Sequence, residues 1–369
     1  MGRGFRYRPA HRERGPPVKQ SRVGEARRLL FVRPRFLGDV CLTLPAVDAA
    51  LAAQPGARAA YVTEAGLAPL LRGDPRFDEV IEVPARLDAA ATLALVRRMR
   101  AFAPDVTFDF FCNPRTALWT RLSGAPVRVG YPNKGWRSAM YTHHARPRTL
   151  SSVGFHLASV EALGWPVPVG DVSPRLVLPE AIRTEAREAL RALGVPDDAR
   201  LVGLHPGARW PTRRWSPERF AALAQHALEA HADVVVLVSA GPGERAMAEA
   251  VLASLPRDRA HLIEGWPLAR FVALQSWCTA FVCGDTGPVH TAVAAGAPTL
   301  GLMSRNRPAM FFPYPEADGH RAYWSRAECS PCDRDQCDDL RADARAHEPQ
   351  SPGHVLPLPR GRWPSRVLV

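Results

Sequence analysis

An acidic residue stands at a strand-to-helix turn near the start of this chain, where it could take a proton from a bound hydroxyl group. Residues 28–45 read RLLFVRPRFLGDVCLTLP, an apolar run followed by Gly38-Asp39 and then a helical pattern. Open α/β sheets bind ligands at the carboxyl ends of their strands. Asp39 is therefore a candidate general base, and Gly38 lets a ligand approach closely. The alternative is that Asp39 only caps the helix.

A second segment combines glycine with arginines ahead of a helix. Residues 201–220 read LVGLHPGARWPTRRWSPERF, with Ser216 as the expected N-cap and Pro217 as the first helical residue. Gly207 and the guanidinium groups of Arg209, Arg213 and Arg214 suit a diphosphate near a helix N-terminus. A surface loop of solvated arginines is the alternative.

Two further turns complete the set of candidate ligand-binding loops. In CGDTGPVH, residues 283–290, Thr286 and Gly287 offer hydroxyl and amide donors to a phosphate, and His290 follows one turn later. A structural role is the alternative for His290. In SAGPGERAM, residues 239–247, Glu244 stands where a ribose could be bound, although such loops are common.

Cysteines provide a weaker signal. Cys329, Cys332 and Cys337 form a CxxC with a third cysteine, but no fourth metal ligand is evident. We expect a structural or incidental role there, no catalytic metal and no cofactor. The total of seven cysteines, an odd number spread over the chain, suits a reducing cytoplasm.

The elements that must position these turns alternate between strand and helix, which predicts parallel sheets in an α/β protein. The first half predicts strands at 28–33, 58–63, 78–83, 105–111 and 127–131 and helices at 40–53, 64–72, 87–102, 114–123 and 151–163. The second predicts strands at 200–205, 233–239, 260–263, 279–283 and 298–303 and helices at 179–193, 216–230, 243–254, 267–276 and 287–295.

The same pattern divides the chain into five parts. We predict a disordered basic tail at 1–26, an N-terminal α/β domain at 27–165 and a proline-containing linker at 166–178. A C-terminal α/β domain follows at 179–337, and residues 338–369 lack periodicity. Two domains of this kind place their acidic turns on opposite sides of one cleft.

The net charge of +12 is unevenly distributed, because residues 1–28 alone contribute +7. The remainder is only mildly basic, which argues against a nucleic-acid partner and leaves contact with an anionic membrane surface open. The sequence contains no apolar run of 18 residues, so we expect no transmembrane helix. The N-terminus also lacks the apolar stretch of a signal peptide. We therefore expect a cytoplasmic protein, either free or peripheral to the inner face of the plasma membrane.

Together these motifs resemble glycosyltransferase family 9, the lipopolysaccharide heptosyltransferases. The resemblance covers about residues 27–337 and is carried by FLGDVCLTLPAV, LHPGARWPTRRWSPERFAALA, GDTGPVHTAVAAGAPTLGL and ECSPC, in this order. It implies a GT-B fold of two Rossmann-like domains, the first for the acceptor and the second for the nucleotide sugar. It also implies an inverting, metal-independent transfer from a nucleotide-diphosphate sugar, usually ADP-heptose. It places the catalytic base on Asp39 and the donor site on Gly207, Arg213, Glu244, Asp285, Thr286, Gly287 and His290. Arg213 stands where the family has lysine.

The predicted reaction is thus glycosyl transfer to a phosphorylated or lipid-linked saccharide of the cell envelope. Basic residues of the first domain, namely Arg33, Arg35, Lys134 and Arg137, are the candidates for binding the acceptor. Two other classes remain open: a nucleotide-sugar epimerase on the same architecture, and a non-catalytic nucleotide-sugar-binding protein.

Overall fold

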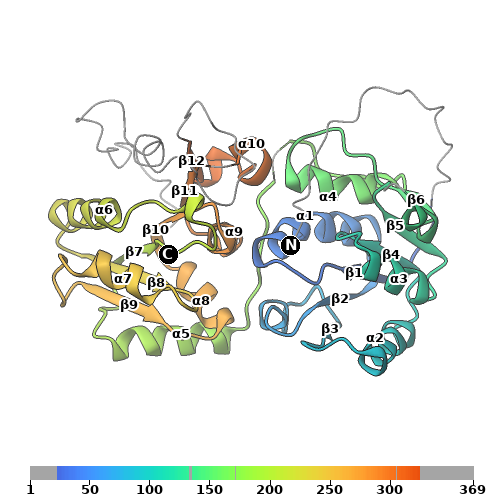
Figure 1. Ribbon diagram of the computed structural model, residues 1–369, viewed down its shortest axis with the longest axis horizontal. Coiled ribbons are helices and arrows are strands. Elements are labelled where there is room, and N and C mark those ends of the chain that lie inside the picture. Colours follow the sequence, from blue (N-terminus) through green and yellow to red (C-terminus); the bar gives the residue numbers. More distant parts are fainter. Residues whose placement is uncertain (1–22, 133–134, 171, 305, 325–369) are drawn as a thin grey trace.

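The structure, a computed structural model, describes residues 23–132, 135–170, 172–304 and 306–324. They form two α/β domains side by side, each built on a six-stranded parallel sheet (Figure 1). This confirms the predicted pair of Rossmann-like domains. Among these residues, no helix is long and apolar enough to cross a membrane. The predicted irregular segment 338–369 and Cys329, Cys332 and Cys337 lie outside the described residues.

The N-terminal sheet has the strand order β3-β2-β1-β4-β5-β6. Its strands are β1 (Arg28–Val32), β2 (Arg58–Glu64), β3 (Glu79–Val83), β4 (Val106–Asp109), β5 (Val127–Gly130) and β6 (His143–His144). The helices are α1 (Leu37–Ala53), α2 (Ala89–Ala101), α3 (Pro114–Leu122) and α4 (Ser152–Glu161), with the 3₁₀ turns η1 (Ala68–Leu70) and η2 (Trp136–Met140). N-cap side chains stabilise the first turns of α2 and α3. Asp88 accepts a hydrogen bond from Ala91 N, and Asn113 accepts one from Thr116 N.

The C-terminal sheet has the strand order β12-β11-β10-β7-β8-β9. Its strands are β7 (Arg200–His205), β8 (Val234–Ala240), β9 (Ala260–Glu264), β10 (Cys278–Gly284), β11 (Thr299–Met303) and β12 (Arg321–Trp324). The helices are α5 (Glu180–Ala192), α6 (Pro217–Ala230), α7 (Arg245–Leu252), α8 (Leu268–Gln275), α9 (Gly287–Ala294) and α10 (Pro308–Phe311), with the 3₁₀ turns η3 (Pro211–Arg213) and η4 (Glu316–Asp318).

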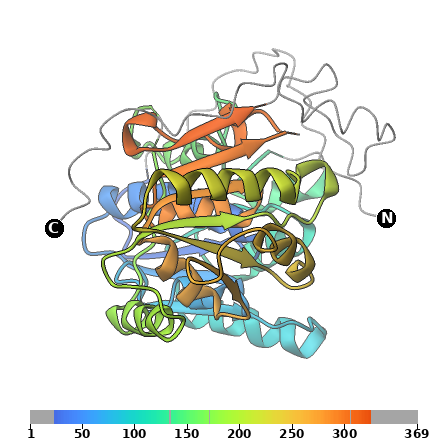
Figure 2. The same cartoon turned by 90° about the vertical axis from the view of Figure 1, so that its left-hand side faces the viewer.

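Both faces of each sheet are buried, as parallel sheets require. In β1, Leu30 and Val32 pack with α2, whereas Leu29 and Phe31 belong to the core on the opposite face. On that second face the ring of Phe31 stacks on the ring of Phe108 with centroids 5.2 Å apart. In the C-terminal domain α6 and α7 cover the outer face of the sheet, which Figure 2 shows toward the viewer.

Three sequence predictions differ from the structure. The predicted helix at 64–72 is wrong: only the 3₁₀ turn η1 forms there. The sixth strand of each sheet, β6 and β12, was not predicted. Residues 23–26, assigned to the disordered tail, pack on the first domain, because Val23 N donates to Leu163 O and Ala26 is buried.

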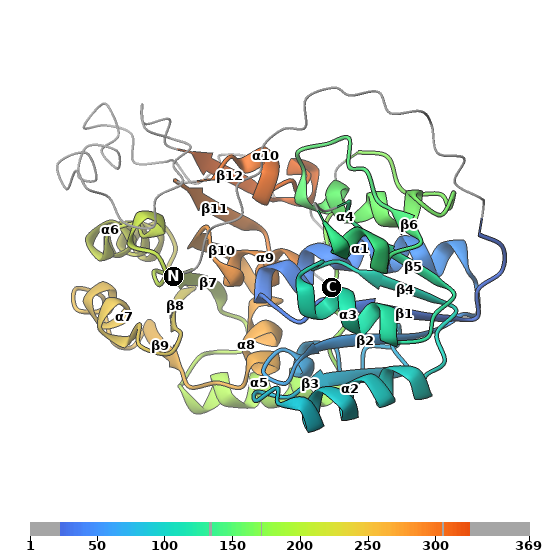
Figure 3. The same cartoon turned by 45° about the vertical axis from the view of Figure 1, so that its right-hand side comes forward.

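The two domains meet where the N-termini of α1 and α9 touch (Figure 3). Neither glycine at this contact has room for a side chain. A Cβ on Gly287 would lie 2.9 Å from Leu37 Cδ2, and one on Gly38 would collide with the ring of His290. One buried apolar cluster continues through this contact from the first domain into the second.

The segment between the domains, predicted as a linker at 166–178, is fixed near its C-terminal end. Leu176 N donates to Ala294 O at 2.7 Å, and Arg76 Nη2 donates to Arg175 O at 2.6 Å. At its end, a Cβ on Gly73 would lie 2.5 Å from Pro179 Cγ. The linker is therefore packed against both domains, which fixes the facing edges of the two sheets.

Candidate functional site

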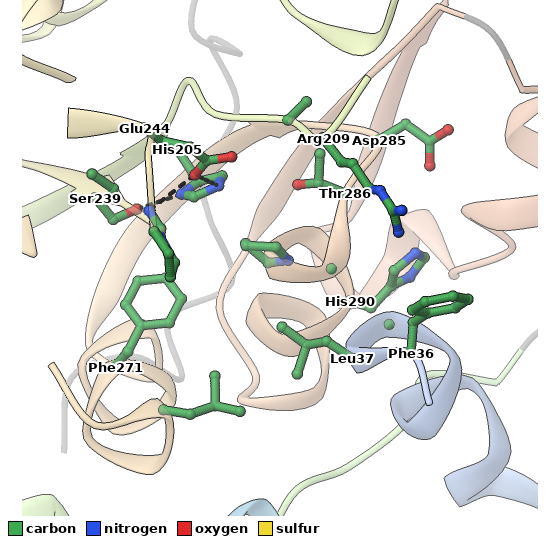
Figure 4. A pocket seen from close by; sticks show the side chains of 18 of the residues that line it. Phe36, Leu37, His205, Arg209, Ser239, Glu244, Phe271, Asp285, Thr286 and His290 are labelled. Carbon is green, nitrogen blue, oxygen red and sulfur yellow. Dashed lines mark hydrogen bonds and ion pairs between the residues drawn. The ribbon is translucent and has the colours of Figure 1, made fainter. Parts of the chain in front are cut away.

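The facing edges enclose a cleft of about 1420 Å³, larger than the ~300–1,000 Å³ of most small-ligand sites. One wall is the start of α1, from Phe36 to Leu42, and the other walls are loops of the C-terminal domain. Figure 4 shows Phe36 and Leu37 on the side of His290, with Glu244, His205 and Phe271 at the other end. The cleft is therefore large enough to hold two small ligands at once.

Asp39 is the third residue of α1, not its N-cap as one interpretation had it. Its carboxylate accepts from Phe36 N at 3.4 Å and forms an ion pair with Arg33, Nη2 to Oδ1 at 2.5 Å. The side chain keeps 30% exposure and lines the cleft. A carboxylate held in this way, with one side open to the cleft, is suited to accept a proton from a bound hydroxyl.

Arg33 lies behind Asp39 and is 8% exposed. Its Nη1 donates to Phe110 O at 2.6 Å, and its guanidinium lies 4.9 Å from the centre of the Phe111 ring. The other candidates for the acceptor are spread more widely. Arg35 is exposed with Nε 3.7 Å from Glu64 Oε1, and Arg137 donates to Cys112 O. Lys134 lies outside the described residues.

The turn from β10 into α9 forms the opposite wall. Thr286 is the N-cap of α9 and Gly287 its first residue, and both line the cleft. A helix N-terminus of this kind attracts anions through its free amides and its dipole. The sequence predicted this arrangement, and the structure places it directly against α1.

Asp285 itself is only 2% exposed and points to protein partners. Its Oδ2 accepts from Asn306 Nδ2 and lies 3.5 Å from Arg213 Nη1, which also donates to Asp285 O at 3.1 Å. Because a carboxylate repels a phosphate, Asp285 is suited to hold Arg213 in place, and the Arg213 guanidinium, one-quarter exposed in the cleft, to meet the anion.

His290 connects the two walls. It is buried, its Nδ1 lies 2.6 Å from Tyr314 OH, and its ring touches Gly38. Burial lowers the pKa of His290 below its ordinary value, while the nearby carboxylates of Asp285 and Asp39 act in the opposite direction. A neutral imidazole that packs between domains fits the structural interpretation of this residue.

Glu244 lies at the far end of the cleft, at the N-cap of α7. Its Oε2 accepts from Gly241 N at 2.9 Å and lies 3.4 Å from His205 Nε2. Gly207 packs so tightly on this carboxylate that a Cβ there would collide with it. The glycine of the HPG loop thus makes room for Glu244, which faces the cleft beside β7 and β8.

Sequence analysis missed the neighbours of Glu244. His205 ends β7, and its Nδ1 lies 3.0 Å from the hydroxyl of Ser239, which donates to Leu204 O. Apolar side chains of Ile263, Trp266, Leu268 and Phe271 line the cleft next to this group. Their signal in the sequence, EGWPLARF, is an ordinary strand-to-helix connection, so only the fold reveals them.

Within the described residues, no group of three or more His, Cys, Asp or Glu side chains could hold a metal ion. The four described cysteines, Cys41, Cys112, Cys278 and Cys283, are free and buried. Burial raises the pKa of Cys41 to about 12 and of Cys278 to about 12, which leaves these thiols protonated and unreactive.

Comparison with known proteins identifies relatives of this chain. The sequence model of glycosyltransferase family 9 (heptosyltransferase) matches residues 92–342. Lipopolysaccharide heptosyltransferase 1 of Pseudomonas aeruginosa is 28% identical over 327 residues, which cover 84% of this chain and 87% of the relative. Lipopolysaccharide heptosyltransferase 2 of Escherichia coli K12 is 24% identical over 298 residues, covering 76% and 84%.

Solved structures show the same fold. A family 9 glycosyl transferase from Veillonella parvula superposes with a TM-score of 0.72 at 22% identity, covering 81% of this chain and 86% of that one. The E. coli heptosyltransferase WaaC with ADP gives a TM-score of 0.66 at 20% identity, covering 86% and 97%. These neighbours confirm the predicted GT-B architecture of two Rossmann-like domains.

Proposed function

This chain belongs to glycosyltransferase family 9, and from that membership we propose that it transfers a heptose from ADP-heptose to a saccharide acceptor of the lipopolysaccharide core. One observation carries the proposal: Asp39 on α1 and the anion-binding turn of α9 with Arg213 face the same cleft. This arrangement supports a base on one side of the reacting sugar and a site for the leaving group on the other.

The donor would occupy the C-terminal side of the cleft. The apolar group of Ile263, Trp266, Leu268 and Phe271 offers a flat nucleobase a place away from water. Glu244 beside it is placed to accept hydrogen bonds from ribose hydroxyls. The diphosphate would then reach Arg213 and the free amides of α9, so that the sugar lies beside Asp39.

The transfer itself is a single displacement. Asp39 takes the proton of an acceptor hydroxyl, whose oxygen attacks the anomeric carbon as the bond from that carbon to the diphosphate oxygen breaks. Attack from the side opposite the diphosphate inverts the anomeric configuration. Arg213 and the α9 amides stabilise the charge that develops on the leaving diphosphate, and such preorganised donors are worth about 3–4 kcal/mol each.

The acceptor would approach over the N-terminal domain, where Arg35 and Arg137 offer positive charge to phosphate or carboxylate groups. Arg33 is not proposed to bind the acceptor, since its guanidinium pairs with the Asp39 carboxylate and donates to Phe110 O. We propose that the reaction needs no divalent cation, because Arg213 and the N-terminus of α9 already stabilise the negative charge on the leaving diphosphate. Turnover should therefore survive EDTA.

The decisive experiment compares wild type with Asp39→Asn in transfer from ADP-heptose to a lipopolysaccharide-core acceptor. Asparagine keeps the size and the hydrogen-bond acceptor for Phe36 N but cannot take the proton, so turnover should fall about 10²–10⁴-fold. Binding of ADP, read from the rise in melting temperature, should persist.

Near-wild-type turnover in Asp39→Asn would remove the base from this position. A nucleotide sugar that is altered without any acceptor would instead indicate an epimerase. If the protein binds ADP-heptose but forms no product with any acceptor supplied, it would be a non-catalytic binding protein.

A further inference from the structure

One stretch of the N-terminal domain is basic without any acidic residue except at its borders. Between Asp109 and Glu161 the sequence has no Asp or Glu, but it contains Arg115, Arg121, Arg128, Lys134, Arg137, Arg146 and Arg148. Residues 110–160 thus carry +7, residues 1–22 carry +6, and all other residues together carry −1. Outside the first 22 residues, the net positive charge of the protein comes from this one segment.

The positive charge of residues 110–160 is not neutralised by acidic side chains of the described residues. None of its six described arginines forms an ion pair with a described residue, whereas arginines such as Arg58, Arg98 and Arg200 elsewhere do. Burial lowers the pKa of Arg128, and the neighbouring positive charge of Arg121 lowers it further. Such uncompensated positive charge costs stability unless an anionic partner binds to it.

Helix α3 presents part of this charge together with apolar side chains. Thr116, Ala117, Trp119 and Thr120 point inward and are buried. The opposite side consists of Arg115, Leu118, Arg121 and Leu122, where Leu118 is 43% and Leu122 39% exposed. Trp136, in the adjoining turn η2, is 56% exposed. We call these five residues the α3 face; Figure 3 shows α3 at the front of the N-terminal domain.

We propose that the α3 face docks this protein on an anionic lipid bilayer. Arginines attract the negative headgroups, each worth about 1 kcal/mol near the surface. Leucine and tryptophan side chains between them gain free energy by entering the interfacial layer, where tryptophan is especially favoured. A soluble polyanion satisfies the arginines alone and gives the leucines no apolar partner.

The position of the α3 face suits a membrane-anchored acceptor. The loop before α3 supplies Phe110 O and the Phe111 ring to Arg33, and Arg33 holds Asp39. One short loop therefore separates the docking face from the candidate base. The docking inference goes beyond the proposed function, and vesicle binding tests it without any donor or acceptor.

The test measures co-sedimentation of the full chain with vesicles of phosphatidylglycerol and phosphatidylcholine over a series of salt concentrations. Arg115→Gln/Arg121→Gln removes two charges from exposed positions. At about 1 kcal/mol each, vesicle affinity should fall roughly 30-fold at low salt. Leu118→Ser/Leu122→Ser should weaken binding as well, but without changing its dependence on salt.

Arg257→Gln/Arg321→Gln is the matched control, since both arginines are exposed in the other domain, Arg257 before β9 and Arg321 at the start of β12. It should bind vesicles like wild type. An ADP-induced rise in melting temperature equal to that of wild type shows that each variant is folded and keeps its donor site.

Three results would overturn the inference. Wild type could fail to bind anionic vesicles, or the α3 variants and the Arg257/Arg321 control could lose affinity equally. Third, the leucine variant could bind vesicles like wild type while soluble heparin competes fully, which would show a general polyanion surface. None of these results bears on heptose transfer, which is measured with a soluble acceptor.

Discussion

At the scale of single residues, the position of Asp39 depends on Arg33, which the sequence analysis had predicted to bind the acceptor. Arg33 is buried behind the carboxylate and joins it to the loop after β4. Without this guanidinium, Asp39 can rotate away from the cleft, and small errors in the position of a base are costly. Arg33 is therefore best described as a positioning residue.

We predict that Arg33→Gln lowers kcat about 10–100-fold, as expected for a misplaced base, with little change in the KM for the acceptor. Arg33→Lys should recover part of the loss. Steady-state kinetics separate the two parameters, and Arg27→Gln, at an exposed position, is the control. A raised acceptor KM at unchanged kcat would restore the original assignment of Arg33 to acceptor binding.

Arg213 allows an equally direct test on the donor side. Arg213→Ala should weaken ADP far more than adenosine, because only the diphosphate meets the guanidinium. Lysine at this position keeps the charge and should rescue much of the affinity, although it cannot reproduce the contact to Asp285 O at full strength. Calorimetric titration of both ligands measures the difference; equal weakening would mean that Arg213 acts through folding.

At the scale of elements, the contact between α1 and α9 sets the distance from the proposed base to the proposed leaving-group site. The glycines there are required by space and not by backbone angle: neither Gly38 nor Gly287 has a positive φ. Any side chain at either position must push the two helix ends apart. The geometry of the proposed site and the contact between the domains thus depend on the same residues.

Gly38→Ala should therefore lower both melting temperature and turnover, because its Cβ meets the His290 ring, which Tyr314 holds in place. A loss of about 1–3 kcal/mol is typical of overpacking. Gly66→Ala, with nothing within 4 Å, is the matched control. In the double variant with His290→Ala the cost of Gly38→Ala should shrink; additive effects would refute the steric explanation.

Elements also show what the sequence could and could not predict. VVVLV at 234–238 is continuous and β-branched, so β8 was evident. β6 has only two residues, His143 and His144, and exists because Val129 and Gly130 offer it an edge. At 64–72 Pro69 and the turn at Gly73 limit the helix to η1.

The same distinction applies to the site. Asp39, Arg213, Thr286 and Gly287 stand in glycine-containing turns whose residue types suggest chemistry, and the fold brings them to one cleft. His205 and Phe271 lack such a signal, because their roles depend on partners distant in sequence. Arg33 was predicted to bind the acceptor, and only the fold shows that its guanidinium joins Asp39 to Phe110 O.

At the scale of the whole molecule, buried histidines should make stability depend on pH. Burial lowers the pKa of His144, His156, His205, His261, His290 and His320 below the ordinary value of 6.5. The unfolded chain then binds more protons than the folded one below that pH, so stability is lost as the pH falls through about 6.5.

We expect the free energy of unfolding to decline by about 1.4 kcal/mol per pH unit for each histidine that remains neutral in the folded state. Urea titrations between about pH 8 and pH 5 measure this slope. In His156→Gln, which removes one such group, the decline should be shallower. A stability independent of pH across this range would show that these histidines protonate without unfolding.

The tight seam between Leu37, Gly38, Gly287 and His290 has a consequence for recombination among related enzymes. A chimera that takes its first domain from one parent and its second from another inherits half of the seam from each. Donor specificity should therefore transfer between relatives only when the start of α1 travels with its partner turn on α9. The start of α1 and the turn into α9 should therefore be exchanged together, even though 245 or more residues separate them along the chain.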